Sequence, residues 1–564
     1  MKLRLSASNP GSGVLTVLAN ARVLPLGDVA SSGVPAGGAS ASGVAANGVA
    51  VSGVAAGLPA SGARASAIPV SDVPVSDVPL SDVPLSDIVL RDGLIAAVLP
   101  AGAASTIPES ESAERRDLAG RFVVPGLWDA HVHFTQWAHT ASRLDVAVAA
   151  SAADAARLVA ERATTAAETS LGHAPLIGYG FRDALWDDEP DAALLDAAAP
   201  GRPVILISGD LHAAWLNRLA LVEHGLADHE TGLLREEDAF TVLRRLDDVP
   251  DEVADAWAHD AARAASARGV VGVVDMEMAW NVDVWQRRIA GGNTQLRVEF
   301  GVYTQFLDRA IAEGLQSGQT IPHTHGLLRM GPYKVITDGS LNTRTAYCFA
   351  PYPEPMEGEG EHGALTIPPE QLEPLMTKAH RAGIRSAVHA IGDRANALAL
   401  DAFEHTGAAG SIEHAQLLQQ SDIRRFAELG VVASVQPEHA MDDRDVAEHH
   451  WAGHTGRTFP LRDLLDAGAT LALGSDAPVA PLDPWVAVSA AVHRSRAGRE
   501  PWHAEQAITL EEALRASTRT RVGEGESADL AILGEDPRSL DADALRNIRV
   551  DATLVNGRFT HDAL

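Results

Sequence analysis

Side chains that could bind a metal ion follow several short apolar runs of this 564-residue sequence. His131 and His133 stand two positions apart at the end of the run 122–130. On a strand they would share one face, where two imidazoles can chelate a single divalent ion. Lys334 lies inside another apolar run, where a buried ammonium costs free energy unless it is paired or neutralised. A lysine that has added CO2 would instead supply an anionic oxygen ligand, which is one reason to bury it.

The same pattern recurs further along the chain. Three more candidate ligands each end an apolar run: His389, His414 and Asp476. A single His-x-His is common by chance, but five such sites of metal-binding residue types in order indicate a metal centre. The C-terminal ends of barrel strands meet at one rim, so we expect these side chains to converge there.

The middle of the chain, about 123–518, alternates short apolar runs with stretches rich in Ala, Leu, Arg and Glu. Two examples with helical apolar spacing are 152–167 and 372–382. Alternating strands and helices predict a parallel sheet, and the length of this region favours a closed barrel. Periodicity alone leaves a doubly wound sheet open. The candidate ligands at the ends of the runs favour the barrel.

Both ends of the chain are rich in β-forming residues. The expected strands lie within 14–26, 86–99, 528–533 and 548–559. Asp92-Gly93 and Asn556-Gly557 predict tight hairpin turns inside the second and fourth of these segments. We therefore expect one composite β-domain built from both termini.

A low-complexity insert at about 27–85 separates the first two of these segments. It contains a five-residue repeat that ends in proline, as in Val70-Ser71-Asp72-Val73-Pro74. A proline at every fifth residue is incompatible with a helix, and the insert has no large side chains for a core. We expect an extended insertion without a function of its own. A structural or adhesive role would rest on these repeats alone.

The composition argues against certain classes of binding partner. There are 75 acidic and 45 basic residues, a formal charge of −30, which disfavours nucleic acid and anionic membrane surfaces. The single cysteine, Cys348, excludes an intrachain disulfide and a thiolate metal site. No apolar run has the length of a membrane span or of a signal peptide. These features predict a soluble, cytoplasmic protein that acts on a small molecule.

Several stretches together resemble amidohydrolase family 3, the YtcJ-like branch of the metal-dependent amidohydrolase superfamily. The matching stretches are 124–133 (VPGLWDAHVH), 178–181 (GYGF), 211–217 (LHAAWLN), 338–340 (DGS), 344–346 (RTA), 388–395 (VHAIGDRA), 412–416 (IEHAQ), 434–437 (SVQP) and 474–478 (GSDAP). The resemblance covers nearly all of the chain except the insert. Two departures are the insert itself and a shortened stretch after Leu514.

The resemblance implies an α/β fold, a TIM-like (β/α)8 barrel with a composite β-sandwich domain formed by both termini. The implied domains are 1–124 and 523–564 for the sandwich and 125–522 for the barrel, with a substrate-side insertion at about 140–260. It also implies two metal ions. His131, His133, Lys334 and Asp476 would hold the more buried ion, and Lys334, His389 and His414 the more exposed one.

Two divalent ions would make a bridging water acidic enough to supply hydroxide at neutral pH, and one would polarise the scissile carbonyl. Asp476 is the expected proton shuttle. We expect hydrolysis of a non-peptide C–N bond, in a linear amide or an N-acyl or N-formyl amine. The ligand types favour zinc, with an N6-carboxylated Lys334. His212, Arg344 and His439 are candidate substrate contacts, although each could equally be structural. The resemblance also suggests a homodimer.

Other interpretations remain open at this point. A mononuclear deaminase of the same superfamily would use the histidines and Asp476 without the lysine. Lys334 argues against it, although a lysine can form a salt bridge instead. A non-catalytic scaffold could keep the barrel and lose ligands, but all six candidate ligands are present.

Overall fold

The computed structural model describes residues 15–26, 83–107, 112–146, 148–166, 175–181, 183, 186–208, 213–235, 237–246, 249–341, 343–355 and 360–564. The predicted insert lies outside these residues except for its last three positions. The chain divides into two compact units, which are described separately. Unit 1 comprises Met1–Val132, Ala265–Gln286 and Thr294–Leu564, and unit 2 comprises His133–Ala264 and Arg287–Asn293. The predicted boundaries at 124/125 and 522/523 stay a prediction.

An eight-stranded parallel sheet forms the centre of unit 1, in the order β18-β17-β16-β15-β14-β13-β12-β6. Its strands are β6 (Leu127–Val132), β12 (Val270–Asp275), β13 (Arg297–Tyr303), β14 (Leu328–Ile336), β15 (Ser386–Ala390), β16 (Gly410–His414), β17 (Val432–Val435) and β18 (Leu471–Leu473). A parallel bridge between Val132 and Ala477 and a 2.7 Å hydrogen bond from Asp476 N to His131 O bring the two outer strands together. The sheet is thus a nearly closed barrel, and the predicted TIM-like fold is confirmed.

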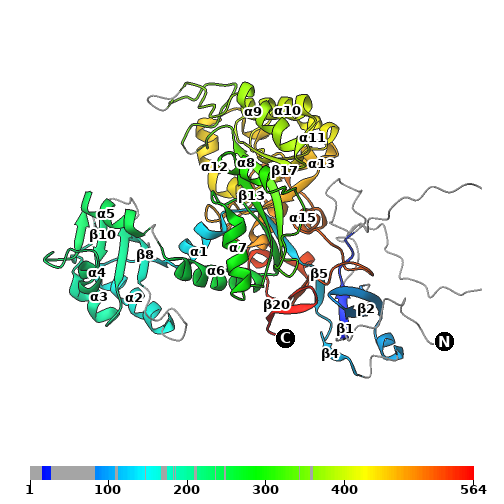
Figure 1. The fold of residues 1–564 in the computed structure, drawn as a ribbon, viewed down its shortest axis with the longest axis horizontal. Helices are drawn as coiled ribbons and strands as arrows, with labels where there is room; N and C mark the ends of the chain where they lie inside the picture. The colour runs from blue at the N-terminus through cyan, green and yellow to red at the C-terminus, as the bar shows by residue number, and fades with distance from the viewer. Residues whose placement is uncertain are drawn as a thin grey trace, which may run out of the picture. The chain divides into compact units, whose positions relative to one another are not determined.

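Helices follow the barrel strands along the chain, and Figure 1 shows α8, α10 and α13 around β13 and β17. They are α7 (Asn281–Ala290), α8 (Thr304–Ala312), α9 (Pro369–Arg381), α10 (Asp393–Thr406), α11 (Ile423–Leu429), α12 (His439–His450), α13 (Leu461–Asp466), α14 (Pro484–His493) and α15 (Leu510–Ala516). Local signals set several of their ends. Gly407, in the left-handed region, ends α10, and a capping box between Thr509 and Glu512 begins α15.

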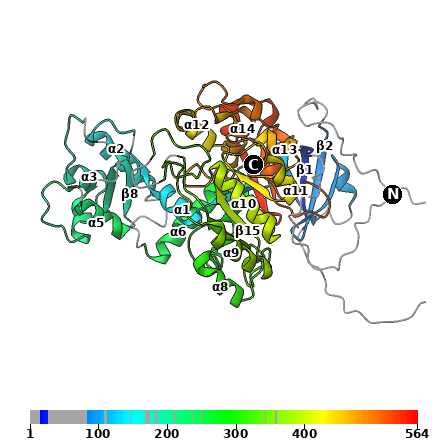
Figure 2. The ribbon, with the colours of Figure 1, turned by 90° about the horizontal axis from the view of Figure 1, so that it is seen from above.

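The two chain ends form a second eight-stranded sheet, in the order β21-β20-β19-β5-β1-β2-β3, with β4 paired to β1. Its strands are β1 (Thr16–Val23), β2 (Leu85–Arg91), β3 (Leu94–Pro100), β4 (Glu114–Asp117), β5 (Phe122–Pro125), β19 (Leu530–Leu533), β20 (Val550–Val555) and β21 (Arg558–Asp562); α16 (Ala542–Arg546) lies between β19 and β20 in the sequence. Figure 2 shows β1 and β2 side by side. Asp92-Gly93 and Asn556-Gly557 form the predicted turns, with positive φ at both residues of each.

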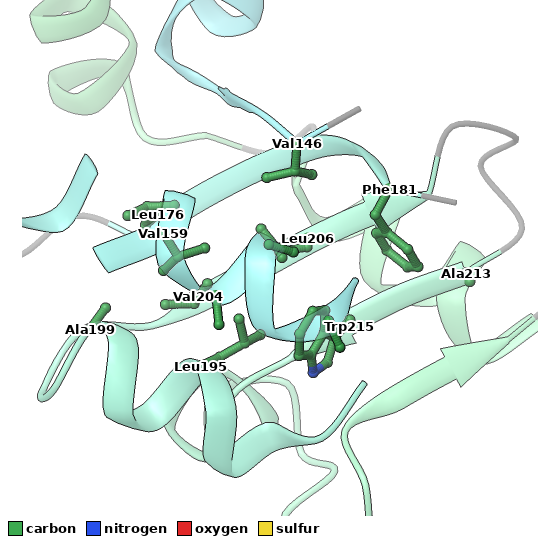
Figure 3. Close-up of a cluster of buried hydrophobic side chains, with 13 residues drawn as sticks. Val146, Val159, Leu176, Phe181, Leu195, Ala199, Val204, Leu206, Ala213 and Trp215 are labelled. Carbon is green, nitrogen blue, oxygen red and sulfur yellow. The ribbon is translucent and has the colours of Figure 1, made fainter. Parts of the chain in front are cut away.

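Unit 2 contains a five-stranded sheet in the order β11-β10-β9-β8-β7. Its elements include β7 (Leu144–Asp145), β8 (Leu176–Phe181), β9 (Val204–Ser208), β10 (Ala213–Leu216), β11 (Leu233–Arg235), α1 (Phe134–Ser142), α2 (Ala152–Ala166), α3 (Ala192–Ala198), α4 (Arg218–Glu223) and α5 (Glu237–Leu246); α6 (Asp251–Ser266) runs from unit 2 into unit 1. Figure 3 shows the apolar cluster between sheet and helices, in which Leu195 lies beside Trp215 and Val204. The rings of Phe181 and Trp215 meet edge to face, with centroids 6.4 Å apart. Unit 2 thus has a hydrophobic core of its own.

Of the helices in the described ranges, none is long and apolar enough to cross a membrane.

Candidate metal centre

The candidate ligands of the barrel lie at or next to the carboxyl ends of its strands. His131 belongs to β6, Lys334 to β14 and His389 to β15, whereas His414 ends β16 and Asp476 follows β18. The His414 ring lies at the middle of the cluster, with its centroid 5.1 Å from that of His131 and 4.4 Å from that of His389. His131 Nε2 is 3.5 Å from Asp476 Oδ1. The structure therefore brings side chains from five barrel strands to one place.

Two sets of three side chains have ligand atoms close enough to share an ion. One set is His131, His133 and Asp476, and the other is His414, His439 and Asp476. Within each set the ligand atoms lie within 4.8 Å of one another. All of these residues are buried except His133, which is partly exposed. Asp476 belongs to both sets, so it is placed to contact ions on either side.

Glu413 orients the His131 ring. Its Oε2 lies 2.7 Å from His131 Nδ1, and both side chains are 1% exposed. Burial alone would raise the pKa of Glu413, but the hydrogen bond from His131, the charge of Lys334 and the Ser411 hydroxyl lower it to about 2. The anionic carboxylate accepts the Nδ1 proton and leaves the lone pair on Nε2. A metal-binding imidazole needs this tautomer.

Gln436 has the same effect on His414. Its Oε1 lies 2.8 Å from His414 Nδ1, so the amide oxygen accepts that proton and leaves Nε2 as the potential ligand. Burial lowers the pKa of His414 well below its usual value, so the ring is neutral at physiological pH. His414 and Asp476 also have positive φ angles of 76° and 57°. Such backbone strain at non-glycine residues is typical of functional sites.

Lys334 is 1% exposed, and its Nζ has no hydrogen-bond partner among the described residues. Burial lowers the pKa of Lys334, while the negative charges of Glu413 and Asp476 oppose the shift. A buried amine beside imidazoles and a carboxylate has an obvious role if it reacts with CO2, because the carbamate would bind metal through oxygen. The residues present therefore fit a divalent metal centre.

The Nε2 atom of His389 faces the loop that follows β14. That atom lies 3.4 Å from Asp338 Oδ1 and 3.5 Å from Gly339 O. Burial lowers the pKa of His389 to about 3. Asp338 also accepts hydrogen bonds from the backbone N–H groups of Tyr347, Ile391 and Gly392. Asp338 therefore ties the loops after β14 and β15 together and orients His389.

The three predicted substrate contacts have different positions. His439, the first residue of α12, belongs to the cluster and is 7% exposed. Arg344 lies in the loop after β14 with φ 55°, and its guanidinium donates to Glu354 O at 2.8 Å. His212 lies outside the described residues. Of the three, only His439 has been placed among the candidate ligands.

The side chains that hold the ligands are not among the residues predicted from the sequence. Glu413 and Gln436 are two of them, and Asp129 is a third, accepting from the N–H groups of His131 at 3.1 Å and Ser475 at 3.0 Å. Burial raises the pKa of Asp129 to about 7. All three stand within the stretches that carry the family resemblance, next to or two to three residues from a candidate ligand or a strand end. Their closeness in sequence to the candidate ligands is the feature that could have identified them.

Known proteins with similar sequences cover most of the chain. It is 29% identical over 444 residues to protein LONG AFTER FAR-RED 3 of Arabidopsis thaliana, which covers 71% of this chain and 74% of that protein. YtcJ of Bacillus subtilis (strain 168), provisionally named an amidohydrolase, is 25% identical over 498 residues, 80% of this chain and 91% of YtcJ. An N-substituted formamide deformylase of Arthrobacter pascens is 25% identical over 503 residues, 79% and 89% of the two chains.

A solved structure supports the fold. The uncharacterized metal-dependent hydrolase from Pyrococcus horikoshii OT3 matches with a TM-score of 0.67 and 23% sequence identity, covering 94% of this chain and 99% of that one. The model of the amidohydrolase family matches residues 114–561, well over half of the sequence. The chain therefore belongs to the amidohydrolase family and is a hydrolase that acts on carbon–nitrogen bonds.

Proposed function

We propose that this amidohydrolase is a binuclear metal enzyme that hydrolyses a linear amide or an N-acyl amine, with N-formyl amines as the first candidates. The observation that carries the proposal is the buried Lys334 amine, which has no hydrogen-bond partner among the described residues and lies close to the charges of Glu413 and Asp476. A mononuclear deaminase would bind its single ion without this lysine, so the buried amine would have no role as a ligand. In a binuclear hydrolase, the carboxylated lysine would be a ligand of both ions.

The assignment of ligands follows the sequence prediction. His131, His133, Lys334 and Asp476 would hold the more buried ion, and Lys334, His389 and His414 the more exposed one. Lys334 would serve both after its neutral amine adds CO2, forming an N–C bond and releasing one proton. Imidazole and carboxylate ligands with an anionic carbamate favour zinc.

Bound divalent ions would lower the pKa of a water molecule and polarise the amide carbonyl. The chain supplies the proton transfers. The Asp476 carboxylate would take the proton from the attacking water and give it to the leaving nitrogen, so that acid and amine are released. Glu413 and Gln436 keep the His131 and His414 rings in the required tautomers through their 2.7 Å and 2.8 Å contacts.

The choice of substrate class rests on similarity. The Arthrobacter pascens relative is named for N-substituted formamides, and the two sequences align over most of both chains. A formamide also presents the smallest acyl group that the proposed chemistry can cleave. We therefore place N-substituted formamides before N-acetyl amines and peptides.

The test is a substrate panel with the zinc-loaded full chain. N-alkyl formamides, N-acetyl amines, a dipeptide and an aminated heterocycle are compared by the release of formate, acetate, amino acid or ammonia. We expect formate from the formamides in the parent and none from Asp476→Asn. Ammonia from the heterocycle without acid from any amide would contradict the proposal and favour the deaminase.

A further inference from the structure

His439 lies in the metal-binding cluster but is not among the ligands assigned under the proposed function. Its ligand atom is within 4.8 Å of those of His414 and Asp476, and all three residues are buried. His389, which the sequence predicts as a ligand of the more exposed ion, is in neither of the two sets found among the described residues. Its Nε2 instead faces Asp338 and Gly339. Around His414, the geometry favours His439.

The backbone holds His439 in this position. Gln436 accepts the hydrogen bond from His439 N at 3.1 Å with its carbonyl, and the side chain of the same residue orients His414 at 2.8 Å. Glu438, one residue before His439, forms ion pairs with Arg496 at 2.8 Å and with Arg546 at 2.7 Å. The start of α12 is therefore fixed on both sides of the peptide that carries His439, and one residue, Gln436, positions both imidazoles.

The side chain of His439 lacks a partner that would explain its burial. Nε2 is buried and has no hydrogen-bond partner in the parts of the chain that the structure describes. A buried polar atom without a partner costs free energy, and a divalent ion is a partner that an imidazole nitrogen binds well. The rings of His414 and His439 are 13° from parallel, with centroids 6.2 Å apart.

We propose that His439, rather than His389, joins His414 as a histidine ligand of the more exposed ion, and that Asp476 also contacts this ion. The inference rests on the proposed function, because it requires a divalent ion at this end of the barrel. It adds to that function a ligand from the start of α12, the helix that follows β17. The loop between β17 and α12 would then help to determine how tightly the second ion is held.

The test is metal binding by the full chain, stripped of metal and titrated with Co²⁺ alone against a competing chelator. Three variants are compared with the parent: His439→Ala, His439→Gln and His449→Ala. His449→Ala is the matched control, because His449 is an exposed histidine of the same helix. The readouts are the number of ions bound, the affinity of each, and the visible absorption of bound Co²⁺, none of which requires turnover.

We expect both His439 variants to keep one tight ion, to bind the second at least about tenfold more weakly, and to change the Co²⁺ spectrum of that ion. The His449 variant should match the parent. Parental affinity for both ions in His439→Ala would overturn the inference, and a raised KM in that case would make His439 a substrate contact instead. A parent that binds no Co²⁺ would overturn the proposed metal centre as well, so the two failures are distinguishable.

Discussion

The terminal sheet and the carboxyl ends of the barrel strands belong to the same unit, and both contain buried side chains. The sheet buries the carboxylates Asp87 and Asp551, but its main cluster is aliphatic. In the sheet, Leu18, Ile532 and Leu554 are 0% exposed and pack into one aliphatic cluster. At the barrel ends, Lys334 and Glu413 are 1% exposed. Burial of the aliphatic groups stabilises the fold, whereas burial of the ionisable groups costs free energy unless partners or ligands offset it. The first region supports the fold and the second supports chemistry.

Residues other than glycine with positive φ angles occur in both regions, but in different settings. In the hairpins of the sheet, positive φ angles occur at Asp92-Gly93 and Asn556-Gly557, where tight turns require them. At the barrel ends they occur at His414 and Asp476, where no glycine lowers the cost. Two candidate ligands therefore carry backbone strain, and Asn20 and Ala119 show that such strain also occurs in the region of the terminal sheet. Changes in the two regions should consequently have separable effects on activity, stability and metal binding.

The largest expected effect is on turnover. Asp476→Asn removes the proposed proton shuttle while keeping the size of the side chain, so kcat should fall about 10²- to 10⁴-fold. Asp476 is also a proposed metal ligand. The thermal unfolding midpoints are therefore compared after both proteins have been stripped of metal, and they should then be close to each other. Steady-state kinetics and circular dichroism check the two halves of the prediction. A kcat near that of the parent would contradict the prediction, because it would show that Asp476 is not a catalytic carboxylate. The barrel ends would then not differ from the terminal sheet in this respect.

The next effect is on stability. Ile532→Ala leaves a cavity among the buried residues of the terminal sheet and should destabilise the fold by about 2–5 kcal/mol. Metal bound per folded chain should not change, since the sheet contributes none of the proposed ligands. Urea unfolding and elemental analysis of the folded fraction measure these quantities. Loss of metal from a fully folded variant would show that the two regions are coupled.

A third effect concerns the residues that hold the ligands. Glu413→Gln keeps the shape of the side chain and an acceptor oxygen near His131 Nδ1, but it removes the negative charge that makes the His131 ring a stronger ligand. Metal affinity should fall about 10- to 100-fold, measured by competition with a chelator. The control is Glu505→Gln, because Glu505 is an exposed carboxylate that lies far from Glu413 in the sequence and is not a proposed ligand. Equal affinities in the two variants would mean that Glu413 is structural.

The smallest expected effect concerns the reactivity of Cys348, a buried ionisable residue that is not a proposed metal ligand. Burial raises the pKa of the Cys348 thiol to about 12, so the proton stays on sulfur throughout the neutral range. Since the thiolate is the reactive form, iodoacetamide at pH 8 should leave the native protein unmodified and should alkylate it fully in urea. Mass spectrometry gives the stoichiometry. Rapid alkylation of the native chain would contradict this assignment of the buried environment.

The sequence contained the strand-end pattern of the site because that pattern is local. The pitch of a strand relates His131 to His133, and Asp-Gly and Asn-Gly pairs predict hairpin turns without any tertiary information. The support of the ligands is not local, since 282 positions separate His131 from Glu413. The grouping of His439 with His414 and Asp476 likewise depends on how α12 begins after β17. Such relations appear only once the barrel places its strands side by side.

The central claim is a lysine-bridged binuclear centre, and metal content tests it most directly. The full chain is purified without chelators beside Lys334→Ala, and both are measured by elemental analysis. A lysine-bridged centre should give close to two divalent ions per chain in the parent and a clear loss in the variant. One ion per chain that is unaffected by the substitution would contradict it.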